Sequence, residues 1–395
     1  MAKKAYNPYE KYGVRRTINA AGTLTKVGGS IAPPEVFKAM EDASKSFVQI
    51  PELQLWAGRE IAKATGSEAG LPTAGSSNSI LLTAAACMMK GTKLEECDPM
   101  ESETWTKHIQ KLPMHTEGLK TEFIVQKSNR NTYDHAVECA GGRFIEVGTE
   151  KGATEEDLDR AFNPEKTAAY YITDRSAGGH LPLATVAEIA HKHGVPVIID
   201  AASELPPKKN LRRYIEKGAD LVVISGGKFI SGPNNSGILT GRADLIKLAH
   251  LQAYPFHGIG RACKMCRETI VALVTALKKY LELDEGPLFE KWEKKAKWIA
   301  EQLDAIPGVG AGVTYSTTVE ENEPQWPICH VEIDDKVYEI TGTELSNKLR
   351  QGDPSIEARY RAADRRLIVN PEFLLEGDEE IVTNRIKEIL ANARK

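Results

Sequence analysis

The sequence predicts an α/β protein, in which a large domain with a mostly parallel sheet is followed by a smaller α+β domain. Three observations predict this class. From about residue 68 onward, short apolar runs alternate with stretches of helical periodicity. Two long helical stretches then cover 268–283 and 287–306. The remaining part is mixed, with one strand-like run at 329–333 and a closing helix from Asp378.

The segment before the alternating region is expected to form an extended entry and two helices, because apolar residues recur at helical spacing over 33–47 and 52–65. The expected strands of the large domain cover 123–126, 143–147, 168–172, 195–199, 221–224 and 237–240. The expected helices between them cover 79–90, 154–162, 183–193 and 211–217. Alternation of strand and helix at this spacing indicates a parallel sheet wrapped by helices.

The chain has 395 residues, of which 41% are hydrophobic, and this is enough for a large core and two domains. We expect an N-terminal extension with helices over 1–65 and the large α/β domain over 66–265. The long connecting helix and the small C-terminal α+β domain are expected over 266–395.

The charge balance argues against a nucleic-acid partner. Lys and Arg total 51 against 55 Asp and Glu, which gives a net charge of −4 and no basic excess. The N-terminus lacks an apolar signal core, and the chain has no run of the roughly 18 apolar residues that a membrane span needs. We therefore expect a cytoplasmic protein with no membrane and no nucleic-acid partner.

The cysteines do not indicate a disulfide framework or a metal site. Six cysteines are spread thinly through the chain, which is typical of reduced thiols. Cys263 and Cys266 form a C-K-M-C pair, but no second pair at similar spacing completes a zinc-binding set. No metal is expected.

Ligands of an open parallel sheet bind at the carboxyl ends of its strands, and the first such end is rich in small hydroxyl residues. Gly75, Ser76 and Ser77 form a turn that opens a helix. Free backbone amides at a helix N-terminus suit a phosphate group. The same residue types also cap ordinary helices, so this turn alone does not indicate a ligand.

Two further strand ends carry charged residues. Asp200 directly follows an apolar strand, and a buried carboxylate needs a cation or several hydrogen-bond donors unless it only caps the next turn. Lys228 stands in the run Ser225-Gly226-Gly227-Lys228 after the next strand. Paired glycines let the backbone pack closely and bring the amine near a bound group, whereas an isolated lysine would be solvated.

A phosphate-binding turn, a carboxylate and a lysine at three strand ends together fit pyridoxal 5'-phosphate. The phosphate would bind to the Gly75–Ser77 turn, where Ser225 adds a hydroxyl. The aldehyde would form a Schiff base with Lys228. Asp200 would keep the ring nitrogen protonated, so that the ring can accept electrons from the substrate.

Five stretches of the sequence carry a resemblance to a known family: 18–30, 124–137, 193–207, 218–228 and 258–265. They resemble the selenocysteine synthase-like, or L-seryl-tRNA(Sec) selenium transferase, family of fold-type I pyridoxal phosphate enzymes, which belong to the aspartate aminotransferase superfamily. Within it the chain is most similar to the D-glucosaminate-6-phosphate ammonia-lyase branch. Bacterial selenium transferases carry an extra N-terminal tRNA-binding domain, whereas the family core here begins near Tyr12, so we do not expect tRNA as a partner.

The resemblance implies roles for further residues near the cofactor. Lys228 is implied as the residue bound to the cofactor and Asp200 as the partner of its ring nitrogen. Where family members often have a His-Arg pair this chain has Asn129-Arg130, so Tyr133 or His135 is expected to cover the ring. Further residues are expected to bind the cofactor, and these are Ser203 and, from the neighbouring subunit, Arg261. This last role implies a homodimer or a higher homo-oligomer.

Substrate-binding residues are also implied. The motif P-S-I-E-A-R is similar to the family's Pro-x-Ile-x-x-Arg, whose arginine, here Arg359, would bind a substrate carboxylate, unless it belongs only to a basic surface run. Thr25, with Thr23, is a candidate for lining the same pocket, unless the two threonines only cap and turn the chain. A phosphorylated substrate would need basic residues at the pocket rim, and the candidates are Arg130, Lys26, Lys208 and Lys209.

The expected activity is α,β-elimination on a hydroxylated amino acid or 2-amino sugar acid, with a 2-keto-3-deoxy acid and ammonia as products. Lys228 would remove the α-proton. Selenium or sulfur transfer, racemisation, retro-aldol cleavage and transamination use the same cofactor and stay open as alternatives. A binding protein on a degenerate scaffold is the alternative outside enzymology.

Overall fold

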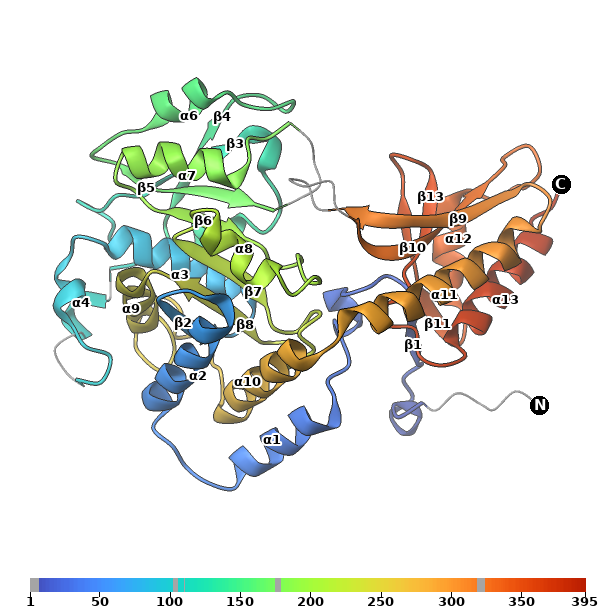
Figure 1. Cartoon of the computed structure of the whole chain (residues 1–395), viewed down its shortest axis with the longest axis horizontal. Coiled ribbons are helices and arrows are strands. Elements are labelled where there is room, and N and C mark those ends of the chain that lie inside the picture. Colours follow the sequence, from blue (N-terminus) through green and yellow to red (C-terminus); the bar gives the residue numbers. More distant parts are fainter. Residues whose placement is uncertain (1–6, 102–105, 110, 175–178, 318–323) are drawn as a thin grey trace. The chain divides into compact units, whose positions relative to one another are not determined.

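The computed structural model describes residues 7–101, 106–109, 111–174, 179–317 and 324–395 (Figure 1). They form two compact units, which are described separately. The larger unit comprises residues 31–283, and the smaller unit comprises the described parts of 1–30, 284–317 and 322–395. Within the part of the chain that the structure describes, no helix combines the length and the apolar content that crossing a membrane requires.

The larger unit is built on a seven-stranded sheet with the order β2-β8-β7-β6-β5-β3-β4. Its strands are β2 (Ala69–Thr73), β3 (Glu122–Gln126), β4 (Arg143–Val147), β5 (Thr167–Thr173), β6 (Val197–Asp200), β7 (Leu221–Ser225) and β8 (Gly237–Gly241). β8 runs antiparallel to both of its neighbours, and the other pairs are parallel. The mostly parallel sheet is thus confirmed. β8 reverses because a loop without a helix joins it to β7, and only antiparallel neighbours can be joined in that way.

Helices cover this sheet, as Figure 1 shows. The helices of the larger unit are α1 (Pro34–Ser44), α2 (Ile50–Thr65), α3 (Ser76–Met89), α4 (Thr106–Ile109), α5 (His135–Cys139), α6 (Glu155–Ala161), α7 (Leu183–Lys192), α8 (Asn210–Glu216), α9 (Ala243–Gln252) and α10 (Arg267–Glu282), of which α1 packs against α10. α3 is apolar on nearly all sides and is buried between the sheet and α9. A helix of this composition is expected in a core, so its N-terminus is held rigidly at the sheet edge.

The smaller unit has an α+β architecture, as predicted. A four-stranded antiparallel sheet has the order β12-β13-β10-β9, and β1 pairs in parallel with β11. The strands are β1 (Thr17–Asn19), β9 (Val309–Thr317), β10 (Pro324–Ile333), β11 (Ser355–Glu357), β12 (Arg359–Arg361) and β13 (Arg366–Val369). The helices are α11 (Glu285–Asp304), α12 (Gly342–Gln351) and α13 (Asp378–Ala391), and they share one apolar core with the strands.

The two compact units divide the chain differently from the expected boundaries after residues 65 and 265. The entry segment belongs to the smaller unit because β1 pairs with β11. α2 packs against β2 of the large sheet, α10 packs against α2, and α1 packs against α10, so all three helices belong to the larger unit. Pairing between distant segments thus decides the units.

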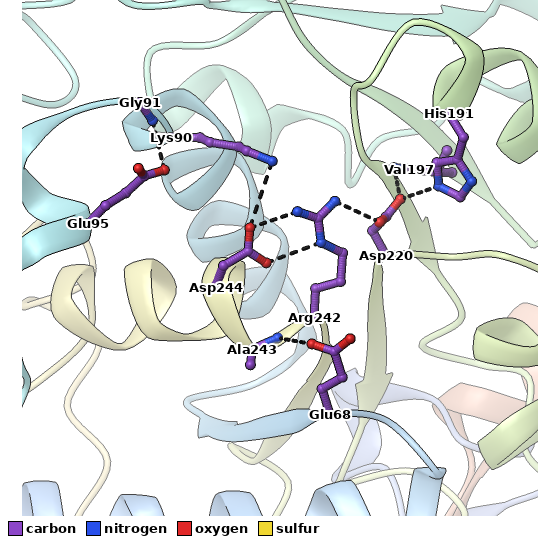
Figure 2. Close-up of polar contacts among 10 residues, drawn as sticks. All are labelled: Glu68, Lys90, Gly91, Glu95, His191, Val197, Asp220, Arg242, Ala243 and Asp244. Atoms are coloured by element: carbon purple, nitrogen blue, oxygen red, sulfur yellow. Dashed lines mark hydrogen bonds and ion pairs between the residues drawn. The ribbon is translucent and has the colours of Figure 1, made fainter.

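Polar contacts fix the amino-terminal ends of β6 and β7 (Figure 2). Buried Asp220 directly precedes β7. Its Oδ2 accepts a 2.8 Å hydrogen bond from the amide of Val197 and lies 2.7 Å from Nε2 of His191. Its Oδ1 accepts from Nη1 of Arg242 at 3.0 Å. Because one carboxylate joins the start of β6, the start of β7 and the residue after the antiparallel β8, this end of the three strands is held in register.

Candidate active site

The turn from β2 into α3 forms a concentration of backbone donors. Gly75 has a φ of 94°, in the left-handed region that favours glycine. No side chain caps the N-terminus of α3. Along the helix, the amide of Ser79 is the first that donates a hydrogen bond back to the turn, and its acceptor is the carbonyl of Gly75. The amides of Ser76 and Ser77 precede it, at the positive end of the helix dipole. Nδ2 of Asn78 is buried without a hydrogen-bond partner among the described residues. This donor set suits an anion such as a phosphate.

Gly237 of β8 brings this turn next to the end of β7. It pairs with Thr73 on one side and with Ser225 on the other, so those two residues are about 10 Å apart across the sheet. A Cβ atom on Gly237 would lie 2.5 Å from the carbonyl carbon of Gly75. The close approach therefore requires glycine, and it places the buried Ser225 beside the turn.

Asp200 is the last residue of β6, and it is buried, with 5% of its surface exposed. It pairs with Thr173 on β5 and with Val223 on β7, so it lies next to the strand that leads to Lys228. Its Oδ1 accepts a 3.1 Å hydrogen bond from the amide of Ala202. A buried carboxylate at this edge is suited to a cationic partner such as a protonated ring nitrogen.

Lys228 is partly buried and follows β7 after two glycines that lie against neighbouring backbone and side chains. A Cβ on Gly226 would lie 2.5 Å from Oγ of Ser236, and a Cβ on Gly227 would lie 2.5 Å from Cα of Asn234. Only glycine fits at these positions, which holds the backbone before Lys228 in one place. The residues at these three strand ends fit pyridoxal 5'-phosphate: donors for the phosphate, a carboxylate for the ring nitrogen and an amine for the aldehyde.

Glu204 is a residue of this edge to which the sequence analysis gave no role. It lies in the loop after Asp200, and its Oε1 accepts a 3.3 Å hydrogen bond from Oγ of the exposed Ser203. Its backbone is fixed on both sides. The amide donates to the carbonyl of Ala201 at 3.2 Å, and the carbonyl accepts from Nδ2 of buried Asn210 at 2.5 Å. Its place four residues after Asp200, on the same loop, is the signal that could have found it.

The surroundings of Glu204 strongly favour its protonated form. Burial, and then the negative charges of Asp174 and Asp200, raise the pKa of Glu204 to about 8, while a hydrogen bond from Ser203 and the charge of Lys228 act in the opposite direction. Asp174 is the residue after β5 and was not predicted either. It is buried, and its Oδ2 accepts a 2.6 Å hydrogen bond from the hydroxyl of Tyr214.

The candidates for covering the cofactor ring lie after β3. The buried Asn129 has its amide committed to β5, since Nδ2 donates to the carbonyl of Thr173 at 2.8 Å and Oδ1 accepts from its amide at 2.7 Å. Asn129 therefore holds the sheet edge in place. Tyr133 and His135 are both exposed, and Nε2 of His135 lies 3.2 Å from Sγ of Cys139.

Two predicted cationic residues have structural contacts inside the larger unit. Nε of Arg130 donates to Asp134 at 2.6 Å and its Nη1 to Glu146 at 2.6 Å, while its guanidinium lies 4.4 Å from the centre of the Phe144 ring. Lys208 donates to backbone carbonyls at the end of α10. Neither contact needs a ligand.

Arg261 lies in the segment between α9 and α10. Its guanidinium lies 5.2 Å from the centre of the Tyr254 ring, and its Nε is buried without a hydrogen-bond partner among the described residues. The segment is fixed because the amide of Gly260 donates to the carbonyl of Gln252 at 2.9 Å. Arg261 thus has a fixed backbone and a buried donor that is not satisfied within the described chain.

The smaller unit contains a cavity of about 580 Å³ that includes Arg359. Among its lining residues, Lys26 and Arg350 pair with the buried Glu357 at 2.7 and 3.1 Å. Arg359 is exposed and makes no ion pair with any residue that the structure describes. Three cations against one carboxylate leave an excess of positive charge in the cavity. Thr25 is exposed and lies in the chain next to Lys26.

Comparisons with known proteins find enzymes that are similar to nearly the whole chain. The family model for L-seryl-tRNA selenium transferase matches residues 134–292. A 5'-C-glycyluridine monooxygenase-decarboxylase from Streptomyces sp is 30% identical over 97% of this chain and 92% of that protein. A D-glucosaminate-6-phosphate ammonia lyase from Salmonella typhimurium is 28% identical over 98% of this chain and 99% of that protein.

Solved structures share the fold. The structure of a D-glucosaminate-6-phosphate ammonia-lyase superposes with a TM-score of 0.81 at 28% identity, and the match covers 99% of this chain and 100% of that one. A serine palmitoyltransferase with pyridoxal phosphate superposes with a TM-score of 0.56 at 13% identity over 95% of this chain and 87% of that one. The second likeness concerns the fold alone, and this fold is that of the fold-type I pyridoxal phosphate enzymes.

Proposed function

Since the chain belongs to the L-seryl-tRNA selenium transferase family of pyridoxal phosphate enzymes, we propose that it catalyses α,β-elimination on a hydroxylated amino acid or 2-amino sugar acid. The products are a 2-keto-3-deoxy acid and ammonia. The observation that carries the proposal is the placement of the Gly75–Ser77 turn, Asp200 and Lys228 at the carboxyl ends of three strands of one sheet.

Different residues of the larger unit would have separate roles in such a reaction. Bound pyridoxal phosphate supplies an electron sink for the bond that breaks at the substrate α-carbon. The amides of the Gly75–Ser77 turn and the hydroxyl of Ser225 would hold its phosphate. Asp200 would hold a proton on the ring nitrogen. Lys228 would anchor the cofactor and, once the substrate amine has taken its place there, its freed amine would take the proton from the α-carbon.

The cavity of the smaller unit supports an acidic substrate. Arg359 has the planar donor geometry that binds a carboxylate with two hydrogen bonds, and no described carboxylate pairs with it. We assign the substrate carboxylate to Arg359. The further positive charge of Lys26 and Arg350 favours a second anionic group on the substrate, such as the phosphate ester in the name of the ammonia-lyase relative.

The proposal includes a homo-oligomer in which Arg261 binds the cofactor phosphate of a partner subunit. The buried Nε of Arg261, which has no acceptor among the described residues, supports it. Size-exclusion chromatography with light scattering tests the oligomer. A monomer that holds its cofactor would contradict this part of the proposal alone.

The test of the activity is a substrate panel for the protein with its cofactor bound. L- and D-hydroxy amino acids and 2-amino sugar acids, each with and without a phosphate ester, are incubated with it, while keto acid and ammonia are measured. Release of both in equal amounts supports elimination. Amino-group transfer without ammonia, inversion at the α-carbon or cleavage of the α,β carbon bond would instead select a transaminase, racemase or aldolase.

A further inference from the structure

We infer that Glu204 is the acid that protonates the departing hydroxyl group in the elimination, and this inference rests on the proposed function. Hydroxide is a poor leaving group, so an eliminating enzyme needs a proton donor at the β-carbon as well as a base at the α-carbon. Lys228 is the base. The described chain offers one carboxyl group at this sheet edge that meets the requirements of the donor.

The first requirement is a fixed position near the reacting groups. The loop after β6 is short, and two hydrogen bonds hold the backbone of Glu204. Its amide donates to the carbonyl of Ala201, and its carbonyl accepts from Nδ2 of Asn210. Its carboxyl group accepts a hydrogen bond from Ser203, and the charges of Asp200, at the end of β6, and of Lys228, after β7, act on it. It therefore belongs to the group of side chains that the sheet edge presents.

The second requirement is a proton to donate at neutral pH. The charged groups that face Glu204 are Asp174 after β5, Asp200 at the end of β6 and Lys228 after β7. Two carboxylates and one amine leave the surroundings negative, and burial adds to this effect. The resulting pKa of about 8 keeps Glu204 mostly protonated at pH 7.

The neighbouring carboxylates of Asp174 and Asp200 have other roles than proton donation to the substrate. Asp174 accepts a 2.6 Å hydrogen bond from the hydroxyl of buried Tyr214. Asp200 must stay ionised to hold the proton of the ring nitrogen. Glu204 is then the acid available to a substrate, and Ser203 orients it.

The step balances without a further reactant. Lys228 takes the α-proton, and the electron pair of that C–H bond forms the double bond between the α- and β-carbons. The C–O bond at the β-carbon breaks, and its electron pair stays on oxygen. Glu204 gives its proton to that oxygen, which leaves as water. Lys228 then releases its proton to solvent, and the carboxylate of Glu204 recovers one from solvent.

The experiment compares Glu204→Gln with wild type on two leaving groups. The substrates are the hydroxy acid that wild type turns over in the panel, with serine as the simplest case, and β-chloroalanine, because chloride leaves without a proton. We expect Glu204→Gln to lose about 10²-fold or more in kcat for water elimination, the range that a general acid contributes. Chloride elimination should be retained. Glu188→Gln, an exposed glutamate on α7, is the matched control and should match wild type on both.

A second readout does not depend on turnover. The infrared difference between wild type and Glu204→Gln, both with cofactor bound, should contain the carbonyl band of a protonated carboxylic acid at pH 6, and the band should fade as the pH rises through 8. Equal losses on both leaving groups, no loss at all, or a band that is absent at pH 6 would each overturn the role of Glu204. If wild type eliminates neither group, the proposed function itself fails.

Discussion

The backbone amide of Asp174 donates a 3.0 Å hydrogen bond to the carbonyl oxygen of Asp200. The two aspartates thus stand side by side at the ends of neighbouring parallel strands, and both are buried. Two buried carboxylates at one edge create a negative environment that favours protonated groups and cations next to it. Glu204 and Lys228 are those neighbours. The acid and the base of the proposed reaction therefore both lie next to this pair of aspartates.

The rate of water elimination should fall as the pH rises past about 8, because Glu204 must be protonated to donate. Its pKa is raised from 4.5 to about 8, so between these values the folded protein holds a proton that the unfolded chain releases. The free energy of unfolding should therefore decrease as the pH rises through this range. Urea unfolding from pH 5 to pH 9 measures this, and Glu204→Gln should remove that part of the decrease. An identical slope in the variant would contradict the raised pKa.

Replacement of Lys228 by alanine should abolish covalent attachment of the cofactor and lower kcat by about 10³-fold or more, since both the anchor and the base are lost. Borohydride reduction of wild type, followed by peptide mapping, should place the label on Lys228. Lys166→Ala, an exposed lysine of the same unit, is the control and should keep label and activity. A label on another peptide would contradict the assignment of Lys228 as the residue that binds the cofactor covalently.

Gly237→Ala should weaken binding of pyridoxal phosphate more than binding of pyridoxal, which lacks the phosphate. The new Cβ would lie 2.5 Å from the backbone of Gly75 and must displace the Gly75–Ser77 turn, to which we assign the phosphate. Overpacking of this kind costs about 1–3 kcal/mol of stability. Fluorescence titration with both forms of the cofactor measures the effect. Gly310→Ala is the control, since its nearest atom is 3.9 Å away. Equal losses of affinity for both forms of the cofactor would contradict the assignment of the phosphate to this turn.

Arg359→Lys should raise KM about tenfold and leave kcat nearly unchanged, because a lysine cannot form the paired hydrogen bonds with a carboxylate. A tenfold change in KM corresponds to about 1.4 kcal/mol of binding free energy. Steady-state kinetics on the substrate from the panel give both constants. Arg361→Lys serves as the control, since Arg361 pairs with Asp364 instead. Indistinguishable KM values for the two variants would contradict a substrate role for Arg359.

Asp220→Ala should destabilise the larger unit by about 3 kcal/mol, because it leaves the amide of Val197 and the guanidinium of Arg242 without their buried acceptor. Asp244→Asn removes the exposed side of the same network and should cost less than about 1 kcal/mol. Urea unfolding of the two variants measures both costs, and Figure 2 shows the contacts around Asp220 and Asp244. Equal costs would mean that burial at Asp220 does not matter.

Much of the candidate site could be predicted because parallel strands end at a common edge. Gly75 and Lys228 follow strands of the sheet and Asp200 ends one, and that alone brings the three residues to one edge of it. Asp174 and Glu204 were not predicted, because their importance comes from burial and from like charges on neighbouring loops. No local pattern records which loops pack together.

The amino-acid sequence by itself determined the alternation of strands and helices, the parallel core of the sheet and the family, because hydrophobic periodicity and strand-end residues are local properties. Only the tertiary structure decided three other features. It reversed β8, it joined the entry segment to the smaller unit through the pairing of β1 with β11, and it gave Glu204 an acidic neighbourhood. The physical reason is that hydrogen-bond pairing between distant segments and the energies of buried charges depend on which residues meet in space.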